Sequence, residues 1–157
     1  MSARYLAKVA VIAALYAVLT LALAPISYGP WQFRVAEALT VLPFVTPAAI
    51  PGLTVGCVVA NILGPGYGIL DIVFGSLATL IAAVLTWRAG KAYLAPLPPV
   101  IVNGVIVGWL IYYVSKAPLV ATMASVAFGE LVVCYAVGYP LLLFIQRNRT
   151  LRELLTK

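Results

Sequence analysis

The chain contains no histidine, only two cysteines and only four acidic residues. Cys57 and Cys134 lie in separate apolar stretches, and neither belongs to a Cys-x-x-Cys pair. Zinc sites and disulfide frameworks need several cysteine or histidine side chains at close spacing. We therefore expect no metal site, no cofactor and no catalytic residue, and a Gly-x-x-x-x-Gly-Lys-Ser/Thr stretch for binding ATP is also absent.

Charged residues of either sign are scarce, and hydrophobic residues are correspondingly abundant. Charged residues make up 9% of the 157 residues and hydrophobic residues 64%, against about 25% and about 45–50% in soluble domains. Because a helix needs roughly 20 apolar residues to cross about 30 Å of hydrocarbon, the chain has room for at most six spans. We expect an all-α integral membrane protein with a single transmembrane domain over residues 1–157.

The apolar runs are separated by segments rich in proline, glycine or basic residues. Two of the runs are short for a full crossing, and there we expect tilted helices or helices with broken ends. The expected spans are residues 5–26, 35–50, 51–63, 69–87, 97–114 and 119–145.

Basic residues flank these runs unevenly. With the N-terminus inside, eight of them fall on the cytoplasmic side, whereas Arg34 and Lys116 fall outside. The eight are Arg4, Lys8, Arg88, Lys91, Arg147, Arg149, Arg152 and Lys157. Cytoplasmic flanks normally carry this excess, so we predict that both termini are cytoplasmic and that the net charge of +6 reflects topology rather than nucleic-acid binding.

Three acidic residues fall inside or at the ends of the expected spans, where ionisable groups are costly and commonly functional. Glu37 opens the second span, Asn61 closes the third and Asp71 opens the fourth, which places all three near the outer face. Glu130 lies deeper in the sixth span. Flat side chains near the same face are those of Tyr28, Trp31, Tyr67 and Trp109. The pattern predicts a pocket, open to the outside, for a planar small molecule rich in hydrogen-bond donors.

Each of these residues also has a purely structural interpretation. Arg34 and Glu37, three residues apart, can form an interfacial ion pair at a helix start. Asp71 can be an acid at the favourable end of a helix dipole, and Asn103 can bond across helices. Tryptophan and tyrosine near helix ends often anchor a helix at the membrane interface.

Small residues form a stripe along one face of the first span. They recur at alternating spacings of four and three, which allows a second helix to approach closely. The stripe consists of Ala3, Ala7, Ala10, Ala14 and Ala17. It serves either packing within the chain or docking of another membrane subunit.

Five distinctive stretches lie along the chain: ISYGPWQFRVAEALT at 26–40, LPF at 42–44, TPAAIPG at 46–52, GC at 56–57 with AN at 60–61, and LDIVFGSLATL at 70–80. They resemble the QueT family, whose members are substrate-binding (S) components of energy-coupling factor (ECF) transporters proposed to import queuosine precursors. The resemblance spans nearly the whole chain.

The resemblance implies a six-helix S component that is not an enzyme and that associates with a transmembrane coupling subunit and two cytoplasmic ATPases. S components of this class carry an Ala-x-x-x-Ala motif on the first helix for contact with the coupling subunit. Ala10 and Ala14 match it, and Ala3 with Ala7 or Ala13 with Ala17 are alternative frames.

The ligand that the resemblance implies is a 7-deazaguanine such as preQ1 or preQ0. We expect Glu37 and Asp71 to accept hydrogen bonds from it or to balance its charge. Asn61 and Asn103 would bind its remaining polar edges, with Glu130 deeper in the pocket. Trp31 or Trp109 would stack on the ring, and Arg34 would pair with Glu37 and hold it in place.

Three other functions compete with this interpretation. An autonomous secondary transporter or channel would use the buried acids as cation sites, but we find no convincing repeat between residues 1–78 and 79–157. A membrane enzyme is disfavoured by the lack of histidine and of a thiol–base pair. A purely structural subunit would bind no small molecule.

Overall fold

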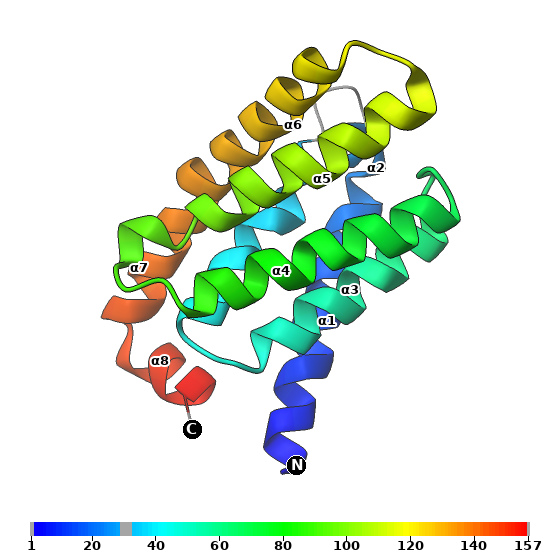
Figure 1. The fold of residues 1–157 in the computed structure, drawn as a ribbon. Coiled ribbons are helices and arrows are strands. Elements are labelled where there is room, and N and C mark those ends of the chain that lie inside the picture. Colours follow the sequence, from blue (N-terminus) through cyan, green and yellow to red (C-terminus); the bar gives the residue numbers. More distant parts are fainter. Residues whose placement is uncertain (1, 29–32, 157) are drawn as a thin grey trace.

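The structure is a computed structural model, and it describes residues 2–28 and 33–156. Within these ranges the chain forms helices and no β-strand, which confirms the prediction of an all-α protein (Figure 1). The α-helices are α1 (Ala3–Ala22), α2 (Ala24–Ser27), α3 (Ala49–Leu63), α4 (Ser76–Trp87), α5 (Leu97–Ser115), α6 (Leu119–Val133), α7 (Tyr139–Arg147) and α8 (Arg149–Thr156). The 3₁₀-helices are η1 (Val35–Phe44) and η3 (Ala92–Leu94), and the π-helices are η2 (Asp71–Gly75) and η4 (Cys134–Gly138).

Three of the helical segments in the described residues are long and apolar enough to cross a membrane. They are Ala3–Ala22, Ala92–Ser115 and Leu119–Arg147, and the shorter apolar segments are Val35–Phe44, Ala49–Leu63 and Asp71–Trp87. Helical structure therefore begins or continues in each of the six expected ranges. The number of crossings remains a prediction, because half of the segments are shorter than a full span.

The expected boundary between the second and third segments differs from the structure, because η1 ends at Phe44 rather than Ile50. The third segment begins at Ala49 rather than Pro51, because proline fits the first turn of an α-helix, where its missing N–H would have no intrahelical partner. Residues 149–156, for which the sequence predicted no helix, form α8. Leu151 N donates to Oδ1 of Asn148 at 3.2 Å, which caps the start of α8.

Glycines allow two helix pairs, α1 with α3 and α5 with α6, to approach closely. A Cβ atom added at Gly56 of α3 would lie 2.7 Å from the carbonyl oxygen of Ala13 in α1. One added at Gly108 of α5 would lie 2.6 Å from the Cα atom of Met123 in α6. Small residues at such contacts are how membrane helices gain packing contacts in the absence of a hydrophobic driving force.

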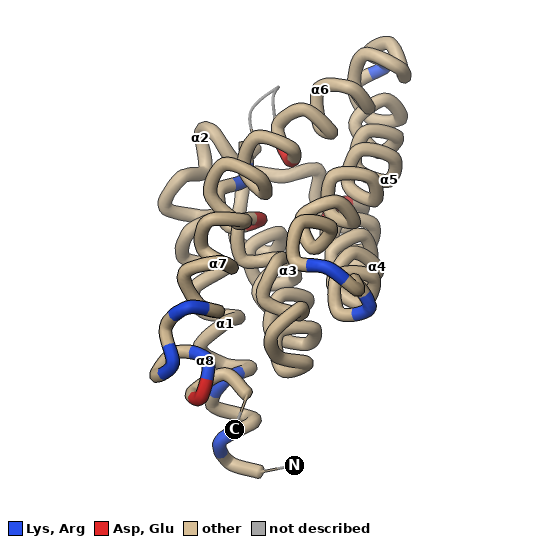
Figure 2. The backbone as a smooth tube through the Cα atoms, turned by 90° about the vertical axis from the view of Figure 1, so that its left-hand side faces the viewer, with Lys and Arg blue, Asp and Glu red and all other residues tan. Residues whose placement is uncertain are grey.

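The chain termini lie at the same end of the bundle, as both views show (Figures 1 and 2). Most of the basic segments lie toward that end, around α1, α8 and the connection that follows α4 (Figure 2). One basic segment lies at the opposite end, at the connection between α5 and α6, where Lys116 stands in the sequence (Figure 2). The side of the membrane on which this end lies stays a prediction from the basic flanks.

Candidate functional site

Glu37 lies in the first turn of η1 with only 1% of its surface exposed. The Tyr16 hydroxyl, from the middle of α1, donates a hydrogen bond to its Oε1 atom. Its Oε2 atom has no hydrogen-bond partner among the described residues. A buried carboxylate oxygen without a donor is costly, so this atom is available to a ligand that brings an N–H group.

Arg34 precedes η1 and is also buried, at 6% exposure. Its guanidinium lies over the Tyr28 ring, 5.1 Å from the ring centroid, and its Nη1 atom lies 3.9 Å from Sγ of Cys57. No contact within 4.0 Å pairs it with the carboxylate of Glu37, so the ion pair considered from the sequence is not present between these two described residues. Arg34 instead contributes a positive charge to the neighbourhood of two buried acids, Glu37 and Asp71.

Asn61 joins α3 to the start of η2. Its Nδ2 atom donates to the backbone oxygen of Asp71 at 2.9 Å, and its Oδ1 atom has no partner among the residues described. Asp71 is the first residue of η2 and is 3% exposed. A Cβ atom added at Gly66 would overlap the Oδ2 atom of Asp71, so the glycine leaves room for that carboxylate. A π-helical turn often marks a functional position inside a longer helix.

Asn103 and Glu130 form a second buried pair between α5 and α6. Nδ2 of Asn103 donates to Oε1 of Glu130 at 2.9 Å, and Sγ of Cys134 lies 3.6 Å from Oε2. Asn103 is therefore bonded across helices, as its structural interpretation predicted. Cys134 also lies 3.5 Å from the backbone oxygen of Glu37, which links this pair to η1.

Three residues of this polar cluster were not predicted as site residues from the sequence: Tyr16, Cys57 and Thr79. Sγ of Cys57 lies 3.3 Å from Oγ1 of Thr79 and 3.5 Å from Nδ2 of Asn61, so the thiol belongs to the apolar core and also borders the polar groups. Cys57 and Cys134 are both free thiols. For Tyr16 the available signal was its position in the middle of a span, whereas a tyrosine that serves as an anchor lies near a helix end.

The aromatic residues expected to line the pocket lie in different parts of the structure. Tyr28 is half-buried under Arg34, and its hydroxyl donates to the backbone oxygen of Ala60 at 2.8 Å. Tyr67 lies in the connection before η2, where partial burial and the Asp71 carboxylate raise the pKa of its phenol, which therefore remains a hydrogen-bond donor. Trp31 lies outside the described residues.

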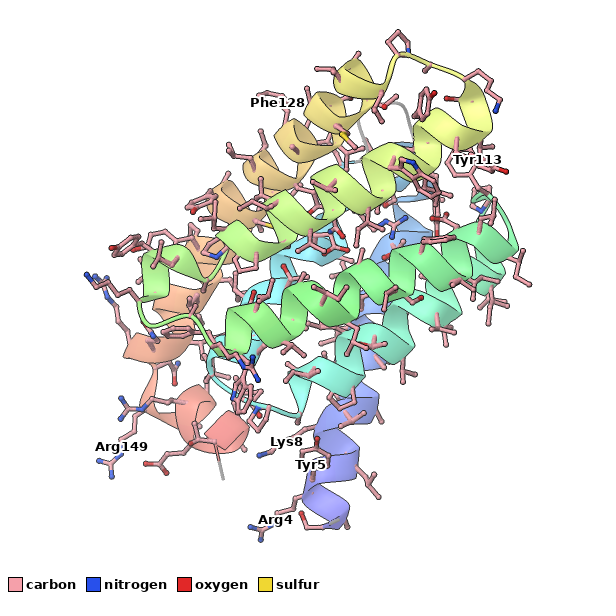
Figure 3. All side chains as sticks on the ribbon, in the orientation of Figure 1. Arg4, Tyr5, Lys8, Tyr113, Phe128 and Arg149 are labelled. Carbon is pink, nitrogen blue, oxygen red and sulfur yellow. The ribbon has the colours of Figure 1, made fainter. Side chains whose placement is uncertain are left out.

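Trp109 is 39% exposed and belongs to an aromatic cluster. Its ring stacks on Tyr113 at 5.6 Å with 20° between the planes and meets Phe74 edge-on at 5.6 Å. Figure 3 shows Tyr113 towards the end of the bundle opposite the termini. These contacts fit an interfacial anchor, and no hydrogen bond joins Trp109 to the acids within the described ranges.

The alanine stripe of α1 is divided between two environments. Ala7, Ala10 and Ala14 are exposed, whereas Ala17 is buried. The helix packs on α3 through another face, which includes Ile12, Ala13 and Tyr16. Three of the four predicted docking residues therefore remain free of contacts that would bury them within the described chain.

Taken together, the site is a buried cluster of two amides, three carboxylates and one guanidinium, contributed by η1, α3, η2, α5 and α6. Glu37 Oε2 and Asn61 Oδ1 can accept hydrogen bonds, and Arg34 can donate them. No three potential metal-ligating residues gather at one point in the described part of the chain. The arrangement suits recognition of a polar, donor-rich solute.

Comparison with known proteins gives two matches. A family described as the QueT transporter has a sequence model that matches residues 6–147. The chain is also similar to a protein of Lactococcus lactis subsp. cremoris (strain MG1363) named "Queuosine precursor transporter QueT", with 41% identity over 75 residues. That alignment covers 46% of this chain and 43% of the relative, so it spans less than half of the relative's length. No solved structure matches.

Proposed function

Because the chain belongs to the QueT transporter family, we propose that it binds and helps to import a queuosine precursor. The relative from Lactococcus lactis carries that substrate in its name. The observation that supports the same substrate class here is the buried Glu37 carboxylate, of which one oxygen is held by Tyr16 and the other has no donor among the described residues.

The proposed ligand is a 7-deazaguanine such as preQ1 or preQ0. A guanine edge presents adjacent N–H donors, which carboxylates accept with short, charge-assisted hydrogen bonds. Glu37 and Asp71 would accept from these donors, and Asn61 would contribute its free carbonyl oxygen. The carbonyl oxygen of the ligand would face Arg34, whose buried guanidinium is not paired with Glu37.

The remaining predicted site residues take secondary places in this proposal. Asn103 and Glu130 form the deeper wall, because they already bond to each other. Tyr28 supplies a flat surface that is fixed beneath Arg34. Trp31 and Trp109 remain proposed as stacking partners at the outer end of the site.

The proposed assembly is an ECF-type importer, in which this chain is the non-enzymatic S component. A transmembrane coupling subunit would contact the face of Ala10 and Ala14, which is exposed on α1. Two cytoplasmic ATPases would supply the energy, since this sequence has no P-loop for ATP. In this arrangement residues 1–157 form a single domain that crosses the plasma membrane six times with both termini in the cytoplasm.

Uptake measurements in cells distinguish this importer from an autonomous transporter. Labelled preQ1 should accumulate in a host that lacks its own uptake system only when this chain is expressed with a coupling subunit and both ATPases. Replacing the P-loop lysine of the ATPases should abolish uptake. Accumulation that persists without the ATPases would contradict the proposal and favour a secondary transporter.

A further inference from the structure

A cleft opens between the first turns of α1 and the C-terminal helix α8, away from the buried polar cluster. It has a volume of about 730 Å³ and its lining includes Arg4, Lys8, Arg149 and Glu153. Figure 3 shows Arg4, Lys8 and Arg149 at the end of the molecule that holds the termini. Three basic side chains and one carboxylate give this cleft an excess of positive charge.

An apolar groove of about 350 Å³ adjoins the basic cleft and shares Ala7, Lys8 and Leu154 with it. Val11, Ile12 and Leu155 complete its wall, and the Leu154 side chain is 63% exposed. The combined surface is amphiphilic, with cations at one end and aliphatic side chains at the other. An occupant of matching chemistry needs an anionic group joined to a hydrocarbon chain.

Contacts within the chain hold the two helices that form this surface. Nζ of Lys8 donates to the backbone oxygen of Leu155 at 3.0 Å, which satisfies a carbonyl group near the end of α8. Arg149 holds the Glu153 carboxylate at 2.8 Å through its Nε atom. Arg149 has four other N–H donors, so this ion pair leaves it able to bind a further anion.

With the segment Leu119–Arg147 across a bilayer, this surface would lie at the level of the lipid headgroups. α8 is amphipathic, with Leu151, Leu154 and Leu155 on one side and Arg149 and Arg152 among its polar residues. Helices of this kind lie in the plane of the membrane interface. α8 follows the long apolar segment Leu119–Arg147 after a single residue, so it begins at the membrane end of that segment.

We propose that the α1–α8 cleft binds one anionic phospholipid, with the phosphate beside Arg4 and Lys8, Arg149 at the α8 rim of the cleft, and an acyl chain along Ala7, Val11 and Leu154. The charge of the cleft selects an anionic headgroup, and the adjoining groove selects a lipid over a free anion. This site requires membrane insertion of the chain but does not depend on the proposed substrate. It would anchor α8 and the start of α1 to one leaflet.

Native mass spectrometry of the full chain in detergent tests the site. The probes are phosphatidylglycerol and phosphatidylcholine with identical acyl chains, so that only the headgroup charge differs. One phosphatidylglycerol should remain bound under conditions that remove phosphatidylcholine. The double variant R4Q/R149Q should weaken phosphatidylglycerol binding roughly tenfold or more, because each basic residue near a membrane surface contributes about 1 kcal/mol.

A matched double variant and an apolar variant separate this site from general charge effects. R88Q/K91Q also removes two basic residues, from the connection after α4, and should leave the bound phosphatidylglycerol unchanged. Leu154→Gln should weaken lipid binding without changing the charge of the protein. Equal retention of the two lipids, equal losses in both double variants, or displacement of the lipid by inorganic phosphate alone would each overturn the proposal. Unchanged melting temperatures would show that all variants are folded.

Discussion

Glu37 combines three properties that are rarely found together inside a membrane protein. It is an acid, it is almost completely buried, and one of its oxygens has no donor among the described residues. Its other oxygen is held by Tyr16 from a different helix, so the carboxylate has a defined orientation before any ligand arrives. An oriented acceptor lowers the entropic cost of binding and makes the site specific for a donor at one position.

Replacing Glu37 by Gln preserves the size of the side chain and removes its charge. Hydrogen bonds to charged groups contribute about 1.5–3 kcal/mol, so Kd for a queuosine precursor should rise by roughly 10- to 100-fold. Titration calorimetry of the purified variant measures this change. Glu153→Gln is the matched control, since Glu153 lies in α8 far along the chain, and should bind as the wild type does. Wild-type affinity in E37Q would remove Glu37 from ligand contact.

Tyr16 should act by positioning Glu37 rather than by touching the ligand. Tyr16→Phe removes only the hydroxyl that donates to Oε1, and leaves the aromatic ring packed in the core. Affinity should fall by less than in E37Q, and the double variant Y16F/E37Q should lose little more than E37Q alone, because the two residues act through one interaction. Additive losses in a double-mutant cycle would contradict this positioning role.

At the scale of elements, contacts between helices depend on glycines that leave no room for a side chain. Gly56→Val would bring a Cβ atom within 2.7 Å of the Ala13 carbonyl oxygen, so α1 and α3 would have to separate. Overpacking of this kind costs about 1–3 kcal/mol and should lower the melting temperature in detergent. Gly90→Ala is the control, because nothing lies within 4 Å of a Cβ atom there. Equal melting temperatures for the two variants would show that this contact does not limit stability.

The exposed alanine face of α1 should matter for assembly and not for folding. Ala14→Trp adds bulk on a surface with no neighbour in the described chain, so ligand binding should persist while co-purification with the coupling subunit is lost. Leu15→Trp is the matched control. Leu15 is 49% exposed and points about 100° away from Ala14 around the helix axis. Assembly that tolerates A14W would exclude this face as the docking surface.

The sequence predicts an element of this structure best when the residue pattern that indicates the element extends over many positions. The runs of apolar residues located the long segments, because hydropathy is summed over many positions. α8 was missed, since eight residues with three leucines fall well below the length of a span. The third segment begins two residues before the predicted start at Pro51, because proline fits the first turn of a helix.

For the side chains of the candidate site, the sequence predicts only those residue types that are unusual in an apolar segment. Glu37, Asn61 and Asp71 were predicted because a carboxylate or amide in an apolar run is conspicuous. Tyr16 and Cys57 were not, since both residue types are common in apolar helices. Their roles depend on contacts with Glu37, Thr79 and Asn61, which are far from them in sequence or on a different helical face.

At the scale of the whole molecule, the basic residues gather toward the end that holds the termini (Figure 2). With that end in the cytoplasm, an impermeant maleimide added to intact cells should label S115C and not G90C. Both positions are exposed. Ser115 is the last residue of α5, and Gly90 lies in the connection between α4 and η3, which precedes the other end of α5. The native Cys57 and Cys134 are buried and give no background. Labelling of G90C alone would show that the chain has the opposite topology. Labelling of both positions would contradict a single orientation of the chain in the membrane.

The central claim is that the buried acid and amide cluster binds a queuosine precursor. It is tested most directly by calorimetric titration of the purified full-length chain in detergent with preQ1, preQ0, guanine and riboflavin. We predict tight binding of a 7-deazaguanine and no tight binding of riboflavin. Binding of riboflavin alone would contradict the substrate, and the absence of binding by a sample that is demonstrably folded would contradict the binding function itself.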